Sequence, residues 1–432
     1  MLKLIFKNLW ARRRRNGWLF AELILVSIVT WVIFDPVVVL THDRDLPLGY
    51  DSDRLALISL ASLPMQAAGY DPAGKDSTVT VDNFFRLIHK VTEYPNVEMA
   101  TPVLGFCYPN SQGNSTSTFK AEGDTANINT MIMYFMPHTH FFETFDFKGS
   151  ARTNAAQLSD HNYTQNEGVI TETFARTAFH IADAGGKRLY SSSNKDTTYM
   201  SIIGTVKPFK AYSSWRPTNV IFKPQLSINT DEIMQNGRIA VRLKEGVSMD
   251  RFLHDFKPWM VKEMKAGNLF ARTVKAYDKI IADREFSEGV TSKYRMNTAL
   301  ALFFMVNLCL GVIGTFWMQT RVRREEVGVM LSFGATPRHI MRLLMGEGIV
   351  LTTIAVLVGC LLYLQYAIKE GLYMGDTWMK VPDKYWVSEF APHFLVLSVL
   401  VYLVLLAVVL IGIYIPARRI SRIPPTEALR DE

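Results

Sequence analysis

Residues 394–415 read FLVLSVLVYLVLLAVVLIGIYI and contain no charged side chain. An α-helix that rises ~1.5 Å per residue needs about 20 apolar residues to cross roughly 30 Å of hydrocarbon, so this stretch predicts a membrane-spanning helix. Three further apolar stretches have a similar length, and they are residues 18–34, 298–318 and 349–367. The sequence therefore predicts an α-helical membrane protein with four transmembrane helices, over residues 17–41, 297–319, 343–368 and 394–415.

The four apolar stretches are unevenly spaced along the 432-residue chain. The first and the second are separated by residues 35–297, whereas the last three follow one another closely. No small-residue cleavage site follows the first stretch, so we expect it to be a retained helix and not a signal peptide. This spacing predicts a large domain, residues 42–295, inserted between the first and second helices, and a shorter loop over residues 369–393.

Basic residues near the helix ends predict the orientation, because Lys and Arg resist translocation. They gather before the first helix, between the second and third, and after the fourth; the last two groups contain Arg321, Arg323, Arg324, Arg338, Arg342, Arg418, Arg419, Arg422 and Arg430. We therefore expect a multi-pass protein of the cytoplasmic (inner) membrane with both termini and the tail, residues 416–432, in the cytoplasm. The net charge of +7 reflects this bias, and it indicates no nucleic-acid partner.

Residues 1–16 predict an amphipathic cytoplasmic helix, because apolar residues recur there at helical spacing. One interpretation is that its basic residues rest on anionic lipid at the membrane surface. These residues are Lys3, Lys7, Arg12, Arg13, Arg14 and Arg15. The other interpretation is that they act only as a signal for the orientation of the first helix. Within that helix, Glu22 favours snorkelling to the inner surface over pairing with a neighbouring helix.

The inserted residues 42–295 predict one α+β extracytoplasmic domain. Residues 42–100 and 227–276 each have a helical stripe followed by a strand pattern, and they flank a strand-rich insertion, residues 101–226. Residues 55–68 are expected to form a helix. Residues 277–296 predict a helical stalk that runs straight into the second membrane helix. Cys107 is the single cysteine of this domain, so we expect no disulfide bond within it.

One stretch of the domain resembles a phosphate-binding loop. Gly69, Gly74 and Lys75 have the required spacing, but Asp76 stands where such a loop has a magnesium-binding Ser or Thr. We therefore expect no ATP-binding site in this chain.

A second stretch, His138-Thr139-His140 with Glu143 and Asp146, offers metal-ligating side chains. A strand and turn with buried aromatic neighbours is the favoured interpretation, because a metal site needs three or four defined ligands. We expect no catalytic residue, no metal and no cofactor of its own in this chain.

Residues 320–342, here called the coupling segment, predict two helices joined by a tight break. Residues 321–333 form a helical pattern with apolar side chains on one side. Gly334 is the residue type that ends helices, Thr336 is suited to cap the next helix, and Pro337 is suited to its first turn. This arrangement offers apolar side chains to a partner on the cytoplasmic face.

The coupling segment and the tail resemble a known family. Residues 323–329 read RREEVGV and are followed by Phe333-Gly334-Ala335 and by Glu347-Gly348, a pattern similar to that of FtsX-like permeases. The tail, PARR at residues 416–419 and PTEALR at residues 425–430, is similar to the ending of MacB-type permeases. Residues 141–149 and 168–179 more loosely resemble the MacB-like periplasmic core domain.

The resemblance implies a non-catalytic permease subunit of an ABC transporter of the mechanotransmission type. ATP and Mg²⁺ would be bound by a separate cytoplasmic ABC ATPase dimer, and the extracytoplasmic domain would move to export or extract a substrate. The expected partners also include a second permease subunit, in a homodimer or a heterodimer, membrane lipids and an extracytoplasmic protein. The residues expected to couple to the ATPase are Glu325, Glu326, Val327, Gly328, Val329, Gly334, Ala335, Thr336 and Arg338.

The sequence departs from the family pattern at one place, because a basic residue usually stands at the position of Met330 or Leu331. This departure predicts an altered contact with the ATPase. An FtsX-like regulator or sensor that acts on an extracytoplasmic partner, such as a cell-wall hydrolase, is the alternative function. It would share the topology and the ATPase.

Overall fold

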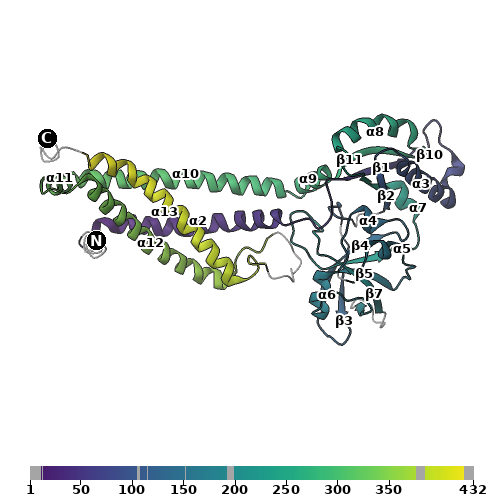
Figure 1. Cartoon of the computed structure of the whole chain (residues 1–432), viewed down its shortest axis with the longest axis horizontal. Helices are drawn as coiled ribbons and strands as arrows, with labels where there is room; N and C mark the ends of the chain where they lie inside the picture. Colours follow the sequence, from purple (N-terminus) through teal and green to yellow (C-terminus); the bar gives the residue numbers. More distant parts are fainter. Residues whose placement is uncertain are drawn as a thin grey trace. The chain divides into compact units, whose positions relative to one another are not determined.

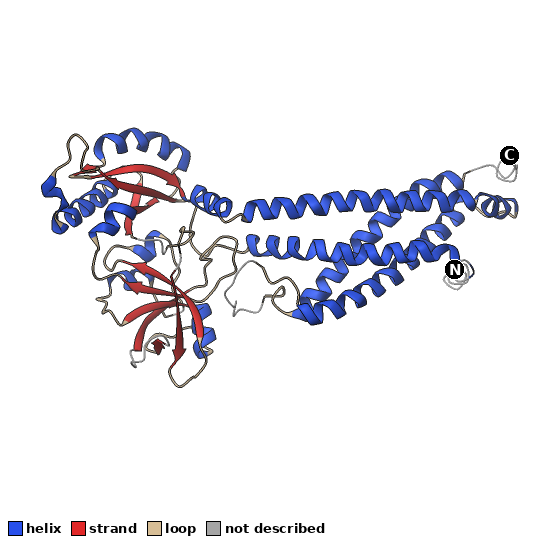
Figure 2. Ribbon diagram, turned by 180° about the vertical axis from the view of Figure 1, so that it is seen from behind, coloured by secondary structure: helices blue, strands red, loops and turns tan. Residues whose placement is uncertain are grey.

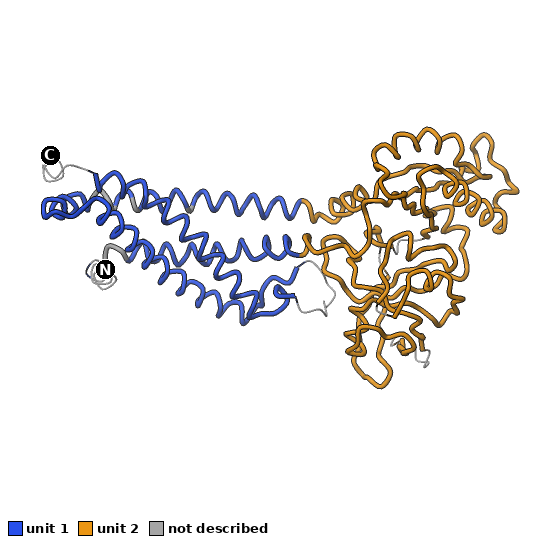
Figure 3. Tube along the Cα trace, viewed as in Figure 1, with its two compact units in different colours: residues 1–42, 292–375, 384–432 blue, residues 43–291, 376–383 orange. Residues whose placement is uncertain are grey.

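The computed structural model describes residues 11, 13–104, 108–113, 115–150, 152–191, 199–375 and 385–422. The chain divides into two compact units (Figure 3). Unit 1 comprises residues 1–42, 292–375 and 384–432, and unit 2 comprises residues 43–291 and 376–383. Residues 43–291 of unit 2 are therefore an insertion in the sequence of unit 1.

Long helices make up the described part of unit 1 (Figures 1 and 2). They are α2 (Arg13–Asp45), α10 (Val290–Val322), α12 (Pro337–Glu370) and α13 (Phe390–Ile420), with the short α11 (Arg324–Ser332) between α10 and α12. Among the described residues, 4 helices are long and apolar enough to cross a membrane, over Gly17–Asp45, Val290–Thr315, Pro337–Glu370 and Phe390–Ile420. Four apolar helices with a large α+β domain between the first and the second agree with the predicted fold class.

Small residues let the helices of unit 1 approach closely. A Cβ atom added to Gly348 of α12 would overlap Ile413 of α13, and one added to Gly359 would overlap Ser27 of α2. Trp31 of α2 stacks on Tyr363 of α12, with 4.5 Å between the ring centroids. Close contact of backbones through small residues is the usual way in which helices associate within a membrane.

Two acidic side chains of α2 have partners on other helices. Asp35 accepts a hydrogen bond from the Tyr373 backbone N–H at 3.0 Å and pairs with His393 of α13 at 2.8 Å. Asp35 and His393 are both buried, and no sequence signal had identified the pair. Glu22 accepts a hydrogen bond from Thr315 of α10 at 3.4 Å, so the structure favours the pairing that the sequence had ranked below snorkelling.

A five-stranded antiparallel sheet forms the first part of unit 2. Its strand order is β10-β11-β1-β9-β2. The strands are β10 (Lys265–Ala266), β11 (Leu269–Ala276), β1 (Leu55–Ser62), β9 (Arg238–Leu243) and β2 (Val97–Val103). Helices α3 (Ser77–Thr92), α7 (Thr230–Asn236) and α8 (Met249–Glu263) contribute to the apolar core on one face of the sheet. The two ends of the inserted domain thus build one sheet.

The expected helix over residues 55–68 is wrong, because residues 55–62 form β1 in the middle of this sheet. Ile58 enters the core under α3 and α8, whereas Leu57 enters the core on the opposite face. A strand buried on both faces shows a continuous apolar run and no alternation, and such a run is easily mistaken for a helix.

A closed barrel forms the second part of unit 2, with strand order β3-β4-β8-β5-β7-β6. Its strands are β3 (Ser115–Ala121), β4 (Ile128–Phe135), β8 (Val220–Pro224), β5 (Glu167–Thr171), β7 (Tyr199–Val206) and β6 (Arg188–Ser191). Neighbouring residues of one strand enter different cores. Ile170 packs with helix α6 (Glu172–Phe179), and Val169 packs with helix α4 (Phe141–Thr144). Helix α5 (Ala155–Asp160) precedes β5.

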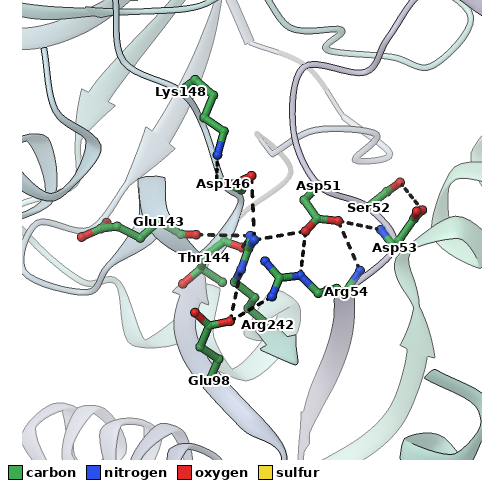
Figure 4. A network of polar contacts seen from close by, with 10 residues as sticks. All are labelled: Asp51, Ser52, Asp53, Arg54, Glu98, Glu143, Thr144, Asp146, Lys148 and Arg242. Carbon is green, nitrogen blue, oxygen red and sulfur yellow. Dashed lines mark hydrogen bonds and ion pairs between the residues drawn. The ribbon is translucent and has the colours of Figure 1, made fainter. Parts of the chain in front are cut away.

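Arg242 joins the sheet to the segment around α4 (Figure 4). It lies on β9 with only 4% of its side chain exposed, and it pairs with Asp51 at 3.1 Å. Its guanidinium group also donates to the Thr144 carbonyl at 3.3 Å, and it lies 3.8 Å from Asp146. A buried guanidinium group is stable only when its donors are satisfied, so this network holds the sheet against the segment around α4.

The two histidines considered as metal ligands lie in a turn after β4. His138 and His140 have φ angles of 61° and 55°, so they do not share one face of a strand. The following phenylalanines, Phe141, Phe142, Phe145 and Phe147, are buried in the core. Within the described ranges, no group of three or more His, Cys, Asp or Glu side chains is suited to hold a metal ion.

The helical stalk predicted over residues 277–296 is two helices and not one. Helix α9 (Tyr277–Ser287) ends before Gly289, whose φ of +72° is a left-handed conformation, and α10 starts at Val290. Glycine adopts this conformation without a steric penalty, and it commonly ends helices for that reason. The prediction of a straight helix is therefore wrong at this glycine.

The last turn of α2 belongs to unit 2, where buried charges surround it. Lys210 Nζ donates to the carbonyl oxygens of Asp43, Arg44 and Leu46 at 2.8, 3.2 and 3.1 Å. Arg216 lies 2.9 Å from the Asp43 carboxylate, with 1% and 3% of the two side chains exposed. We call these residues the α2 clasp. A lysine at a helix C-terminus satisfies carbonyl groups that have no partner within the helix.

We predict that Lys210→Met loosens the end of α2, because three carbonyl oxygens lose a charged donor. Hydrogen exchange of backbone amides in residues 43–50 should become faster by about tenfold or more, as expected for loss of hydrogen bonds to a charged group. The measurement is hydrogen-exchange mass spectrometry on the full-length protein in lipid nanodiscs. Lys257→Met on the exposed surface of α8 is the control, and equal exchange in the two variants would contradict the clasp.

The contribution of Lys210 to stability should depend on pH. Burial lowers the pKa of Lys210 to about 8, although the charges of Asp43 and Glu285 act in the opposite direction. An unfolded lysine keeps its proton up to about pH 10.4, so folding releases this proton between the two values. The stability that Lys210 contributes should therefore increase as the pH rises from about 8 to about 10. The difference in exchange between wild type and Lys210→Met, measured over this range, should grow with pH.

Candidate coupling site

The break between α11 and α12 is built by local hydrogen bonds. The Gly334 N–H donates to the Leu331 carbonyl and the Ala335 N–H donates to the Met330 carbonyl, both at 3.0 Å. This pair of bonds is the Schellman motif, which satisfies the last carbonyl groups of a helix. The motif requires a left-handed residue, and Gly334 has a φ of +90°. The structure therefore confirms that Gly334 ends the first helix of the coupling segment.

The second helix of the coupling segment starts as its residues predict. Thr336 is the N-cap of α12, and its hydroxyl oxygen accepts a hydrogen bond from the His339 N–H at 3.3 Å. Pro337 follows at the first helical position, where its missing N–H has no partner to lose. Arg338 is exposed beside them.

One side of α11 is anchored in the core of unit 1. Val327 is only 4% exposed and packs with Ile340 and Leu344 of α12. Met330 and Ala335 are partly buried against the same cluster. Because these contacts lie on both sides of the break, α11 is held against α12.

A buried ion pair adds a second anchor. Arg323, which precedes α11, lies 2.6 Å from Glu347 of α12, with 13% and 9% of the two side chains exposed. Arg323 also lies 3.7 Å from Glu326 of α11. Removing one partner of such a pair leaves an uncompensated buried charge, so the pair fixes the position of α11 strongly.

The other side of the coupling segment is exposed. Phe333, at the end of α11, is 88% exposed, and Val329 is 44% exposed. Glu325 and Arg338 are also exposed. A large aromatic side chain that protrudes beside charged residues is typical of the centre of a protein–protein contact. The arrangement is suited to docking, and it offers no assembled acid, base or nucleophile among the residues just described.

The structure brings the predicted coupling residues together but gives them different surroundings. Glu325, Val329, Gly334, Thr336 and Arg338 are exposed; Glu326 and Ala335 are partly exposed; Val327 and Gly328 are buried. Phe333, Arg323 and Glu347 were not among the predicted coupling residues. An acidic residue such as Glu347 inside an apolar helix is the sequence signal that could have identified a buried partner.

The predicted membrane-surface residues are mostly beyond what the structure describes. Lys3, Lys7 and Arg12 lie outside the described residues. Arg13, Arg14 and Arg15 lie at the start of α2, which runs on without a break past residue 17, and their side chains are not described. Their contact with lipid stays a prediction.

Two family profiles match this chain. The FtsX-like permease C-terminal profile matches residues 298–425, and the MacB-like periplasmic core domain profile matches residues 48–258. Comparison with curated proteins gives no match.

Solved structures similar to this chain include three domains, each of low identity. A domain of a putative permease from Porphyromonas gingivalis has 18% identity and a TM-score of 0.32, covering 54% of this chain and 93% of that one. The periplasmic region of MacB from Actinobacillus actinomycetemcomitans has 10% identity and a TM-score of 0.28, covering 55% and 94%. The extracellular domain of the noncanonic ABC-type transporter YknZ from Gram-positive bacteria has 12% identity and a TM-score of 0.28, covering 50% and 100%.

The family assignment rests on the two profiles, one of which matches most of unit 2 and the other the C-terminal part of unit 1. The MacB-like match lies within the inserted domain, and the FtsX-like match begins in α10 and includes α11, α12 and α13. The chain therefore belongs to the ABC transporter permeases that combine an FtsX-like C-terminal region with a MacB-like periplasmic core domain.

Proposed function

We propose that this permease couples ATP hydrolysis by a separate cytoplasmic ATPase to movement of its inserted domain, for export or extraction of a substrate. The observation that carries the proposal is the coupling segment, which is anchored on one side and exposed on the other. Phe333 is 88% exposed, whereas Val327, six residues earlier, is 4% exposed. A partner bound to the exposed side would move α11 together with α12, because buried contacts join the two helices.

The anchors supply a mechanical connection within unit 1. The Arg323–Glu347 pair joins the start of α11 to α12, and α12 packs closely on α2 at Gly359 and on α13 at Gly348. Densely packed contacts transmit displacement because they leave little free volume to absorb it. A push on α11 would thus reach the long helices.

The two ends of residues 43–291 differ in whether a glycine interrupts their helical connection to unit 1. Helix α2 continues from residue 13 to residue 45 and ends in the α2 clasp. Helices α9 and α10 are separated at Gly289. We propose that α2 carries the displacement into unit 2 and that the break at Gly289 lets the other connection bend.

The partners follow from the family and from the exposed surfaces. The permeases of this family imply a cytoplasmic ABC ATPase, and ATP and Mg²⁺ would be bound there. Helix α10 exposes apolar side chains along most of its length, including Leu302, Phe303 and Leu310. Such a surface requires lipid or a second permease subunit as its cover. We place the coupling segment and both termini in the cytoplasm and the inserted domain outside, in the inner membrane.

The topology is tested by cysteine labelling with a membrane-impermeant maleimide, after Cys107 is replaced by serine. Single cysteines at Lys120 and at Lys384 should be labelled in intact cells, because both would lie outside. A cysteine at Arg338 should be labelled only after the membrane is opened. Labelling of that cysteine in intact cells would overturn the proposed orientation.

Phe333→Ala tests the docking surface. An exposed aromatic residue at the centre of a contact often contributes about 2 kcal/mol or more, so the affinity for the ATPase should fall by more than about tenfold. The measurement is the amount of ABC ATPase that co-purifies with the full-length permease, followed by titration of the separated components. Phe286→Ala on α9, where the side chain is 71% exposed, is the matched control. Unchanged affinity of the Phe333 variant would place the ATPase contact elsewhere.

Gly334→Val tests the geometry of the break. An added Cβ atom at Gly334 meets open space, so the cost is one of backbone conformation, about 1–2 kcal/mol for a β-branched residue. We expect normal membrane insertion, with weakened ATPase binding or with ATP hydrolysis that no longer responds to the permease. Gly334→Asn should do less harm, because Asn tolerates left-handed conformations better. A valine variant with full ATPase association and full stimulation would remove the coupling role of this break.

A further inference from the structure

A pocket of about 340 Å³ opens in unit 2 beside helix α9. Its lining comes from the sheet, from α9 and from the segment around Tyr108. Leu57 of β1 is part of the lining and faces away from the core under α3 and α8, so the pocket lies on the opposite face of the sheet from these helices. Neither the coupling segment nor the α2 clasp contributes to it.

The register of the sheet brings polar side chains into this pocket. Ser59 of β1 pairs with Arg238 of β9 on one side and with Thr273 of β11 on the other, so the three residues form a row across the sheet. Ala271 pairs with Leu60, which leaves Arg272 as an extra residue of β11, a β-bulge. Bulges redirect side chains, and both Arg272 and Thr273 line the pocket.

The lining is strongly basic. It contains four cations, Arg238, Arg272, Lys275 and Arg284, and a single acid, Asp283. Lys275 lies 2.6 Å from Asp283, and that pair compensates itself. Three guanidinium groups, from β9, β11 and α9, line the cavity beside this pair.

Arg272 and Arg284 have donors that make no hydrogen bond to a described residue. Arg272 is exposed to the pocket, and no hydrogen bond or ion pair joins its side chain to another described residue. Arg284 pairs with Glu288 at 2.9 Å and donates to the Gln112 carbonyl at 3.0 Å, both through Nη1. Its Nε is buried without a partner among the described residues. A buried donor without a partner costs free energy, which a ligand that accepts from it would recover.

Tyr108 lies in the same basic surroundings as the pocket. Burial raises its pKa, and the charges of Arg238 and Arg284 act against that rise. Arg238 lies over the Tyr108 ring at 5.7 Å, and Arg284 lies over the neighbouring Tyr212 ring at 4.8 Å. Aromatic rings thus hold two of the guanidinium groups in place, which leaves less conformational freedom to lose on binding.

We infer that this pocket binds the phosphate group of a small organic phosphate. Guanidinium groups present planar sets of donors that match phosphate oxygens, and a phosphate monoester carries a charge of about −1.5 to −2 that suits several cations. The pocket is larger than one phosphate group requires, and Leu57, Tyr108 and Ile280 offer apolar contact for an organic body. The source of the phosphate is a water-soluble ester or a phospholipid headgroup.

A ligand in this pocket would connect two elements of unit 2. A phosphate held by Arg272 on β11 and by Arg284 on α9 bridges the sheet and the helix that leads to the Gly289 break. The ligand would fix α9 on the sheet. This inference does not depend on the ATPase coupling, because binding can be measured without any ATPase.

The test is calorimetric titration of the full-length protein, in nanodiscs of phosphatidylcholine, with glycerol 3-phosphate and with inorganic phosphate. We expect glycerol 3-phosphate to bind to the wild type, and Arg272→Gln to weaken that binding by about tenfold or more. Arg284→Gln should act in the same direction. Arg251→Gln is the matched control, because Arg251 lies on α8 with 87% of its side chain exposed.

A second arm separates the two sources. Nanodiscs that contain phosphatidic acid should prevent the binding of glycerol 3-phosphate if a lipid headgroup reaches the pocket, and Arg272→Gln protein should retain less phosphatidic acid than wild type. If the source is soluble, phosphatidic acid should leave the titration unchanged. No hydrogen bond or ion pair joins the Arg272 side chain to another described residue, so its replacement should preserve the fold. Absence of binding in both arms, or equal binding by Arg272→Gln and Arg251→Gln, would overturn the inference.

Discussion

The structure of unit 2 depends on the buried charges around the end of α2. Asp43 and Arg216 lie 2.9 Å apart with almost no exposure, and Lys210 donates to three carbonyl oxygens of the same helix end. Buried charges are tolerated only when they are paired and hydrogen-bonded, so the segment that carries Lys210 and Arg216 must close around α2. Glu285 of α9 joins the cluster, because it accepts from Ser213 at 2.8 Å and lies 3.4 Å from Arg44. The two ends of residues 43–291 therefore meet at one site.

The two helices that meet at this site differ in their continuity toward unit 1. Helix α2 enters the cluster as one continuous helix, whereas α9 leaves it toward a glycine whose φ of +72° separates it from α10. In the proposed mechanism, a displacement that arrives through α2 would act on Glu285 through Arg44, and Gly289 would absorb the resulting change of angle. The phosphate pocket lies on the same helix, at Arg284, beside the residue that contacts the cluster. Occupation of that pocket would bias the response of α9.

Local signals in the sequence sufficed for the long apolar helices and for the break at Gly334, because length, glycine and N-cap residues act within a few neighbours. These signals failed where tertiary contacts determine the local structure or the burial of a residue. Residues 55–62 read as a helix because both faces of β1 are buried. Arg242 alternates with apolar residues of β9, yet its side chain is buried in contact with the segment around α4. The predicted straight stalk passed over Gly289, since one glycine inside a helical pattern does not by itself reveal its φ angle.

The same physical rule governs both ends of the proposed mechanical path. At one end, Arg323 and Glu347 fix α11 to α12 by a buried ion pair; at the other, the buried ion pair of Arg216 and Asp43 fixes α2 within unit 2. Between them, α12 and α2 approach so closely that Gly359 leaves no room for a Cβ atom beside Ser27. Ion pairs in a low-dielectric interior and glycine contacts share one property, which is that a small shift costs much of their free energy. Sliding at any of these contacts is therefore unfavourable, and movement of the connected helices as a body is the response that preserves them.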